Sequence, residues 1–456
     1  MSKIKFTLLL IGSLLIGNTD LQAAKKHIVE TKETKADVQS SDVDDSSKTD
    51  SAEGDKPITK KEFDALNAEV AILRDQTARQ LDRTIANSQR SLKISGTLQN
   101  RYTAVTSSNI PQVSNGFTVN AAILSLTGAL KKDYEEGRNL TYVLSTLGSA
   151  PTYNVQPLDV YLQYSILQTL DPEQATLNVQ FGQNKKPFGL EPQVGEDKTP
   201  AANVATFAGG GGLNLAARDI GITFRGDLLP FYDGGFNYRV PLIEYALGLY
   251  NGSGPNASDT NKSKDVVARI NFNAPVDWNS DFRGLTIGSS FYTGKKDLTL
   301  ANGTAITGGT GGASKVRYGQ DISYVASPIG FTAEYAVGRD ENALSGTSLS
   351  NAVKATTESR GYTVTLFYQW GEQFVKAYRN QDRIDDWWPK TYQPFIRFDR
   401  WDPNTALSNN ESTIVTYGFN FFFAETTKLQ LNYIVSDIKS TNTKQNQFVA
   451  QFQYGF

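Results

Sequence analysis

The side chains best suited to chemistry in this sequence are arginines, lysines and carboxylates in segments where polar and apolar residues alternate. If the apolar side of such a segment faces lipid, the charged side must face inward, because a charge on the lipid face near the midplane costs roughly 2–4 kcal/mol. Opposed charges of nearly balanced number set a transverse field and a weak ion preference, which is typical of a broad channel. Taken singly, most of these residues are also explained as solvated side chains or structural ion pairs. The predicted pore lining has the basic members Arg101, Lys186, Arg225, Arg269, Arg317, Arg397 and Lys428, and the acidic members Asp159, Asp219, Glu244, Asp321, Glu334 and Asp399.

Residue types that support active-site chemistry are scarce. The chain has no Cys, which excludes disulfides, thiolate metal sites and cysteine nucleophiles. Its single histidine, His27, lies among polar and charged residues, whereas a Ser-His-Asp hydrolase or a typical zinc site needs imidazoles at the site. We therefore predict no enzyme, no metal and no cofactor, and an outer-membrane hydrolase is the least favoured interpretation. The formal net charge of −2 leaves no basic excess to hold nucleic acid.

The elements that would position the charged residues begin after an N-terminal targeting sequence. Lys3 and Lys5 precede the apolar run 6–17, and a polar stretch then ends in Ala23 and Ala24, after one of which cleavage is predicted. A transmembrane anchor is the alternative, but it needs about 20 apolar residues. The run here has 12 residues. Residues 1–24 are thus expected to be a signal peptide that exports the chain to a Gram-negative outer membrane.

Two segments separate this signal from the rest of the chain. Residues 25–57 are rich in Lys, Asp, Glu, Ser and Thr and contain no aromatic residue, so we expect a disordered linker that cannot offset its ordering entropy. Over residues 58–90 apolar residues recur every three or four positions, which predicts an amphipathic periplasmic helix in a coiled coil. A lone helix packed on its own domain is the alternative, and Thr77 in the seam weakens the zipper.

From about residue 93 the dominant period becomes two. In the last segment Phe452, Tyr454 and Phe456 share one face, while Gln451 and Gln453 share the other. A soluble antiparallel sheet alternates as well, so alternation alone does not decide. The signal peptide, the many strand-like segments of about ten residues and the aromatic last strand together favour an all-β transmembrane barrel over residues 91–456. Phe456 is the expected C-terminal signal of that barrel.

The number of strands follows from parity, since both ends of an outer-membrane barrel face the periplasm and bacterial barrels have even strand numbers. Counting inward from both ends predicts sixteen antiparallel strands, provided that residues 374–381 belong to a periplasmic excursion. The long Gly-, Ser-, Thr- and Asn-rich connections then lie outside, and residues 185–215 become the third and longest of them.

Several segments carry a resemblance to a known family. Residues 177–191, LNVQFGQNKKPFGLE, resemble the strand-five motif of the phosphate-selective porin O and P family. Residues 218–222, 245–252 and 393–399 and the final Phe456 are similar to that family too, and the resemblance covers roughly 93–456. It implies a trimeric barrel of sixteen strands whose third loop folds inward to narrow the pore. The dense ladder of pore-lining arginines and lysines that phosphate-selective members share is not found here.

These observations predict an outer-membrane porin for passive diffusion of small hydrophilic solutes, held as a homotrimer in outer-membrane lipid. A modest preference for small anions is expected. Saturable phosphate binding is not, because phosphate recognition calls for several Arg or Lys donors on one oxyanion. The alternative is a surface adhesin or envelope tether, in which the helix 58–90 and the outer loops bind partners and the barrel is only an anchor.

Overall fold

The computed structural model describes Lys60, Leu66, Val70 and residues 91–456, apart from 111–114, 134–137, 168–175, 195–197, 237, 301–302, 326–327, 372–387 and 425. The predicted signal peptide, the linker and the excursion at 374–381 lie outside the described residues. So does the predicted helix 58–90, except that Lys60, Leu66 and Val70 are helical. Within the described residues, no helix combines the length and the apolar character needed to cross a membrane.

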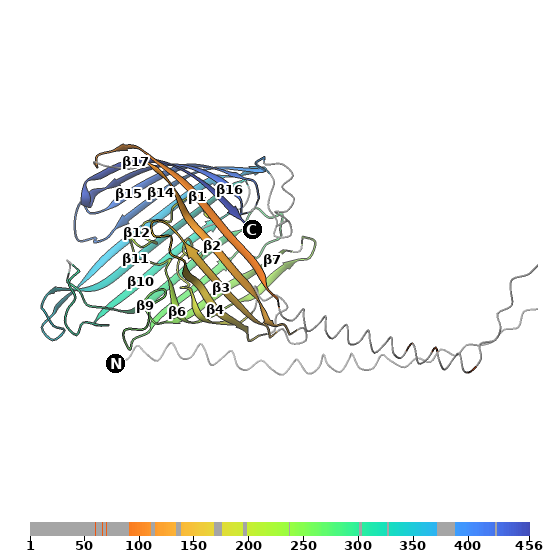
Figure 1. The fold of residues 1–456 in the computed structure, drawn as a ribbon, viewed down its shortest axis with the longest axis horizontal. Helices are drawn as coiled ribbons and strands as arrows, with labels where there is room; N and C mark the ends of the chain where they lie inside the picture. Colours follow the sequence, from red (N-terminus) through yellow and green to blue (C-terminus); the bar gives the residue numbers. More distant parts are fainter. Residues whose placement is uncertain are drawn as a thin grey trace, which may run out of the picture. The chain divides into compact units, whose positions relative to one another are not determined.

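The barrel unit is one closed antiparallel sheet, in which β1 pairs with β17 as well as with β2 (Figure 1). Segments β12 and β13 both pair with β14 and are separated by Gln369 alone, so they form one strand of the wall. The prediction of a sixteen-stranded antiparallel barrel is therefore confirmed. The strands are β1 (Lys93–Ser108), β2 (Gly116–Lys131), β3 (Leu140–Gly148), β4 (Gln156–Ser165), β5 (Asn178–Lys185), β6 (Arg218–Asp233), β7 (Tyr238–Tyr250), β8 (Asp265–Asn273), β9 (Leu285–Lys296), β10 (Ala313–Tyr324), β11 (Ile329–Ser345), β12 (Val353–Tyr368), β13 (Trp370–Gly371), β14 (Thr391–Asp402), β15 (Ser412–Phe422), β16 (Lys428–Ile438) and β17 (Thr443–Gly455), with a short 3-10 helix, η5 (Lys439–Thr441), before the last strand.

The wall buries polar side chains on one face and exposes apolar ones on the other. Gln99 Nε2 donates to Gln453 Oε1 at 2.9 Å, and Gln451 Nε2 donates to Gln430 Oε1 at 3.0 Å, all four side chains being buried. Phe181, by contrast, is 61 % exposed. This distribution is the reverse of that in a soluble globular protein. The outer face therefore suits lipid, and the inner face suits water and polar contacts.

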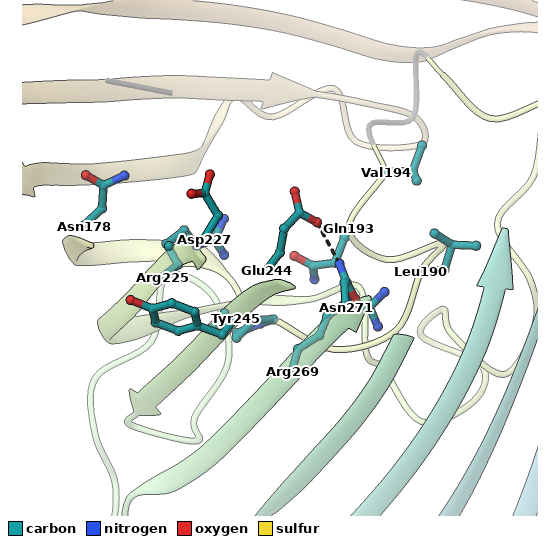
Figure 2. Close-up of a pocket in the computed structure, with 13 residues that line it drawn as sticks. Asn178, Leu190, Gln193, Val194, Arg225, Asp227, Glu244, Tyr245, Arg269 and Asn271 are labelled. Carbon is teal, nitrogen blue, oxygen red and sulfur yellow. Dashed lines mark hydrogen bonds between the residues drawn. The ribbon is translucent and has the colours of Figure 1, made fainter. Parts of the chain in front are cut away.

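The connection between β5 and β6, residues 186–217, is called the inward loop below. It leaves the wall between two neighbouring strands, yet Arg397 of β14 donates to the Asn203 carbonyl and Lys428 of β16 donates to the Thr199 carbonyl. Because β14 and β16 lie across the ring from β5 and β6, the loop must cross the lumen. Part of it is seen beside the wall in Figure 2. The structure thus has the inward third loop that the family resemblance implies.

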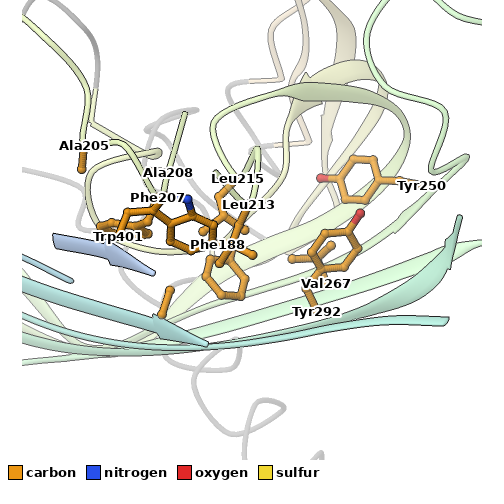
Figure 3. Packing of buried hydrophobic residues seen from close by; sticks show 11 residues of the cluster. Phe188, Ala205, Phe207, Ala208, Leu213, Leu215, Tyr250, Val267, Tyr292 and Trp401 are labelled. Carbon is orange, nitrogen blue, oxygen red and sulfur yellow. The ribbon is translucent and has the colours of Figure 1, made fainter. Parts of the chain in front are cut away.

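The main apolar core lies beneath this loop, where small residues form a flat floor on the wall. Gly319 of β10 pairs with Ala336 of β11, which pairs in turn with Gly361 of β12. A Cβ atom at Gly319 would lie 2.8 Å from the Phe188 ring, and one at Gly361 would lie 2.2 Å from the Phe207 Cβ, both inside van der Waals contact. Figure 3 shows the two phenylalanines within the buried cluster. Because Gly319 and Gly361 have no Cβ atom, the aromatic residues of the loop can pack directly against the wall.

Candidate functional site

Arg397 is the main polar anchor of the inward loop. Its guanidinium forms ion pairs with Glu191 of the loop and Asp399 of its own strand, each at 2.9 Å, and donates to the Asn203 carbonyl at 3.0 Å. Burial raises the pKa of Glu191, and the positive charge of Arg397 acts in the opposite direction. Arg397 and Asp399 are thus both engaged in holding the loop.

Two other basic residues predicted to line the pore bind the same loop. Lys428 is fully buried, and its Nζ donates to the Thr199 carbonyl at 2.8 Å. Arg101 donates to the Ala202 carbonyl at 2.7 Å and to Asn203 Oδ1 at 2.9 Å. The donors of these cations are used on the backbone and side chains of the loop.

Most of the remaining predicted residues are engaged either by backbone N–H groups or by structural ion pairs. Glu334 accepts the Glu191 N–H at 2.8 Å, and Asp219 accepts the N–H groups of Ile220 at 2.8 Å and Gly252 at 2.9 Å. The ion pairs are Arg269–Asp321 at 2.6 Å, Arg317–Asp340 at 2.9 Å and Asp159–Arg218 at 3.2 Å.

A cavity of about 360 Å³ lies between the inward loop and strands β5 to β8, and we call it the β6–β8 cavity (Figure 2). From the loop it is lined by Leu190, Gln193 and Val194. Its size falls at the lower end of the range for sites that hold small molecules. The charged residues that line it from the wall are Arg225, Asp227, Glu244 and Arg269.

Two of these four charges are neutralised by bidentate partners. Arg269 meets the Asp321 oxygens at 2.6 and 2.9 Å, and Asp227 accepts both terminal nitrogens of Arg239 at 2.7 Å. Arg225, in contrast, makes no hydrogen bond or ion pair with the described residues, and its Nε is buried without a partner. Arg225 is thus a predicted lining residue whose guanidinium is not engaged by the described residues.

The only polar contact that Glu244 makes with the described residues is to an amide. Its Oε2 accepts Asn271 Nδ2 at 3.2 Å, as the dashed line in Figure 2 marks. It forms no ion pair with a described cation. Arg225 and Glu244 are therefore an unneutralised charge of each sign on one cavity.

A second cavity, of about 420 Å³, lies on the other side of the loop against β10 to β12 and β14, and we call it the β11–β14 cavity. Leu190 and Val194 line both cavities, so this part of the loop divides the space inside the barrel. The charged residues that line the β11–β14 cavity are Glu191 and Arg397, which are paired with each other, and Glu334 and Lys198, which form no ion pair with the described residues. The two sides of the loop differ in which groups are engaged, because the guanidinium on the β11–β14 side is paired and Arg225 on the β6–β8 side is not.

Lys186 lies at the start of the inward loop. Its Nζ lies 5.4 Å from the centroid of the Tyr292 ring, and burial lowers the pKa of Lys186 to about 8. The charged groups around it are Asp219 and Asp265, which favour the ammonium form, and Lys315 and Arg317, which oppose it. Lys186 is thus a cation whose charge is lost a little above neutral pH.

Phe456, the predicted barrel signal, lies at the junction that closes the sheet. Its N–H donates to the Gly96 carbonyl at 3.0 Å and its carbonyl accepts the Gly96 N–H at 2.9 Å. Its ring, 49 % exposed, stacks on that of Tyr454 with centroids 6.2 Å apart. The terminal residue thus extends the pairing between β17 and β1.

Sequence reasoning missed Glu191, Arg239 and the glycine floor. Glu191 lies in a loop whose path across the lumen no local pattern encodes. Arg239 lies opposite Tyr232 in the register between β6 and β7, so its bidentate pair with Asp227 does not follow from cross-strand pairing. The floor did leave a signal, since Gly319 and Gly361 stand inside strands where a side chain would normally pack.

A closed barrel with an apolar outer face, a polar lumen and an inward third loop defines a porin of the outer membrane. The family model for phosphate-selective porin O and P matches residues 93–456, and the chain belongs to that family. No curated protein matches the chain.

Two solved structures share the fold. Salmonella typhi OmpF in complex with daunomycin is 12 % identical with a TM-score of 0.52, over 81 % of this chain and 99 % of that one. Vibrio cholerae OmpT, folded in vitro and described as a trimer form, is 8 % identical with a TM-score of 0.51, over 80 % of this chain and 99 % of that one. At these identities the likeness concerns the fold alone.

Proposed function

We propose that this porin carries small hydrophilic solutes by passive diffusion, with a modest preference for anions and without saturable phosphate binding. The observation that carries the proposal is the division of the inner charges into bound and available ones. Arg101, Arg397 and Lys428 hold the inward loop, whereas Arg225 and Lys186 have no carboxylate partner within 4 Å among the described residues.

Phosphate selectivity would need several cations with free donors around one oxyanion. In the β6–β8 cavity Arg269 is already bonded to Asp321, which leaves Arg225 as the available guanidinium, with Glu244 on the same wall. One available cation beside one available carboxylate supports a weak field rather than an anion trap.

Planar bilayers test the proposal. Purified mature protein should give stepwise conductance, and reversal potentials in asymmetric KCl should show a small excess of chloride over potassium flux. Arg225→Gln should move the reversal potential toward cations, because it removes an unpaired positive charge, while Lys439→Gln serves as a control on an exposed pair with Asp437. A silent barrel, or block of the chloride current by micromolar phosphate, would contradict the proposal.

The proposed assembly is a homotrimer in outer-membrane lipid. The family resemblance supports it, and so does the trimer form in which OmpT of Vibrio cholerae is described. The mass of the protein in mild detergent tests this directly, and recovery of monomers alone from full-length protein would refute it.

The proposed organisation of the N-terminal part is a signal peptide at 1–24, a linker at 25–57 and a periplasmic coiled-coil helix at 58–90. The sequence patterns described above support it. N-terminal sequencing of the exported protein should begin at residue 24 or 25, and a mature chain that begins at Met1 would show that the signal is not cleaved.

A further inference from the structure

The β6–β8 cavity combines opposite charges in a way that diffusion alone does not require. Arg225 makes no hydrogen bond or ion pair with the described residues, and Glu244 is bound by a single amide. The other two charged side chains on the cavity are Arg269 and Asp227. Each is neutralised by a bidentate ion pair, Arg269 with Asp321 and Asp227 with Arg239. The charge left to a solute is thus one cation and one carboxylate.

Sheet register makes these two groups diagonal neighbours rather than a direct cross-strand pair, a separation that their long side chains could still bridge. Glu244 of β7 is the direct partner of Asp227 of β6, and Arg225 is the direct partner of Ala246. Arg225 and Glu244 are therefore diagonal neighbours on one face, with Cβ atoms about 7 Å apart. No ion pair closes this gap. A molecule with its own separated charges can fill the gap.

Neutral polar groups complete the lining. Asn271, whose Nδ2 orients Glu244, has a buried Oδ1 without a hydrogen-bond partner. Asn178 and Gln193 also line the cavity, the first from β5 and the second from the inward loop (Figure 2). Buried polar groups normally have partners, so the orphaned oxygen of Asn271 and the Nε of Arg225 indicate a place for a polar ligand.

We propose that the β6–β8 cavity is a binding subsite for small zwitterions of the amino-acid type. The carboxylate of the solute binds the Arg225 guanidinium, and its ammonium group binds Glu244 and donates to Asn271 Oδ1. A plain anion meets the repulsion of Glu244, and a plain cation meets that of Arg225. The inference rests on the proposed function, because it names the class of solute that binds at this subsite during its passage through the pore.

The test measures binding and conduction separately on the full-length protein in detergent and in bilayers. The probes are glycine and 4-aminobutyrate as zwitterions, glycinamide as the cation, glycolate as the anion and glycolamide as the neutral analogue. Titration calorimetry should show saturable binding of at least one zwitterion and much weaker binding of the three analogues. Arg225→Gln and Glu244→Gln should each weaken zwitterion binding about tenfold, the usual scale for a charged hydrogen bond.

Two further variants keep the result interpretable. Exchange of the two charges, Arg225→Glu with Glu244→Arg, should restore part of the zwitterion binding with the ligand reversed, whereas Lys439→Gln should leave it unchanged. Heat-modifiable migration in gels shows that each variant is a folded barrel. If wild-type protein conducts KCl but binds no zwitterion, or binds glycolate as tightly, the inference is overturned and the proposed function stands. Saturable zwitterion binding by a barrel that does not conduct would support the subsite and contradict the proposed function.

Discussion

Removal of the Arg397 guanidinium is the perturbation that should act most directly on the inward loop. Arg397→Gln breaks the ion pairs to Glu191 and Asp399, both at 2.9 Å, and leaves two carboxylates in a buried site. Breaking one partner of a buried ion pair typically costs about 3–5 kcal/mol. If that cost falls on the seated loop, the ratio of seated to unseated loop drops roughly 10²- to 5 × 10³-fold. The backbone pairing of β14 does not depend on this side chain, so the wall itself should persist.

Single-channel recording measures the effect. We expect Arg397→Gln to raise the open-channel noise and the mean conductance, because a loop without its anchor leaves the wall more often. The double variant with Glu191→Gln should recover part of the wild-type behaviour, since one of the stranded charges is gone, and the two single effects should not add. Lys439→Gln, in the exposed pair with Asp437, serves as the matched control. A folded Arg397→Gln barrel whose conductance and noise equal those of the wild type would refute the assignment of Arg397 as the anchor.

Three further predictions concern the floor, Lys186 at the start of the inward loop, and the N-terminal region. Gly361→Val should lower conductance, because its Cβ would meet the Phe207 Cβ at 2.2 Å and push the loop toward the β6–β8 cavity, while Gly210→Val, in open space, should have no effect. Overpacking of this kind costs about 1–3 kcal/mol, and unchanged conductance in Gly361→Val would show that the loop does not rest on the floor. Raising the pH from 7 to 9 should move the reversal potential toward cations, since Lys186, with its pKa lowered to about 8, loses its charge over this interval, and Lys186→Gln should abolish the shift. A shift that persists in that variant would assign it to other groups. Deletion of residues 25–90 should leave conductance intact by bilayer recording, and a deletion that spares conductance but releases the protein from the cell envelope would support the tether function for that region.

The fold was accessible from the sequence because a membrane barrel imposes a period of two and an even strand number. Those constraints act locally along each strand. The alternation of apolar and polar positions in β17 and its neighbours could therefore be predicted residue by residue. Whether each inward-facing charged side chain has a bonding partner could not be predicted from the sequence, because this depends on the strand register and on the path of the inward loop. Arg225 and Arg397 both follow the same alternation, yet the first lines the β6–β8 cavity without a partner and the second binds Glu191. No periodic pattern distinguishes them.

The asymmetry of the loop has a consequence for how this pore treats solutes. Polar anchors from β1, β14 and β16 and the glycine floor on β10 to β12 hold the loop against one side of the wall. Arg101, Arg397 and Lys428 on that side hold the loop, and replacing them should change the channel noise before it changes selectivity. The β6–β8 side keeps Arg225 and Glu244 without ion-pair partners, so selectivity should respond there to single substitutions. Two arginines that look equivalent in the sequence, Arg225 and Arg397, should therefore give opposite phenotypes: a shifted reversal potential with quiet channels for the first, and noisy channels for the second.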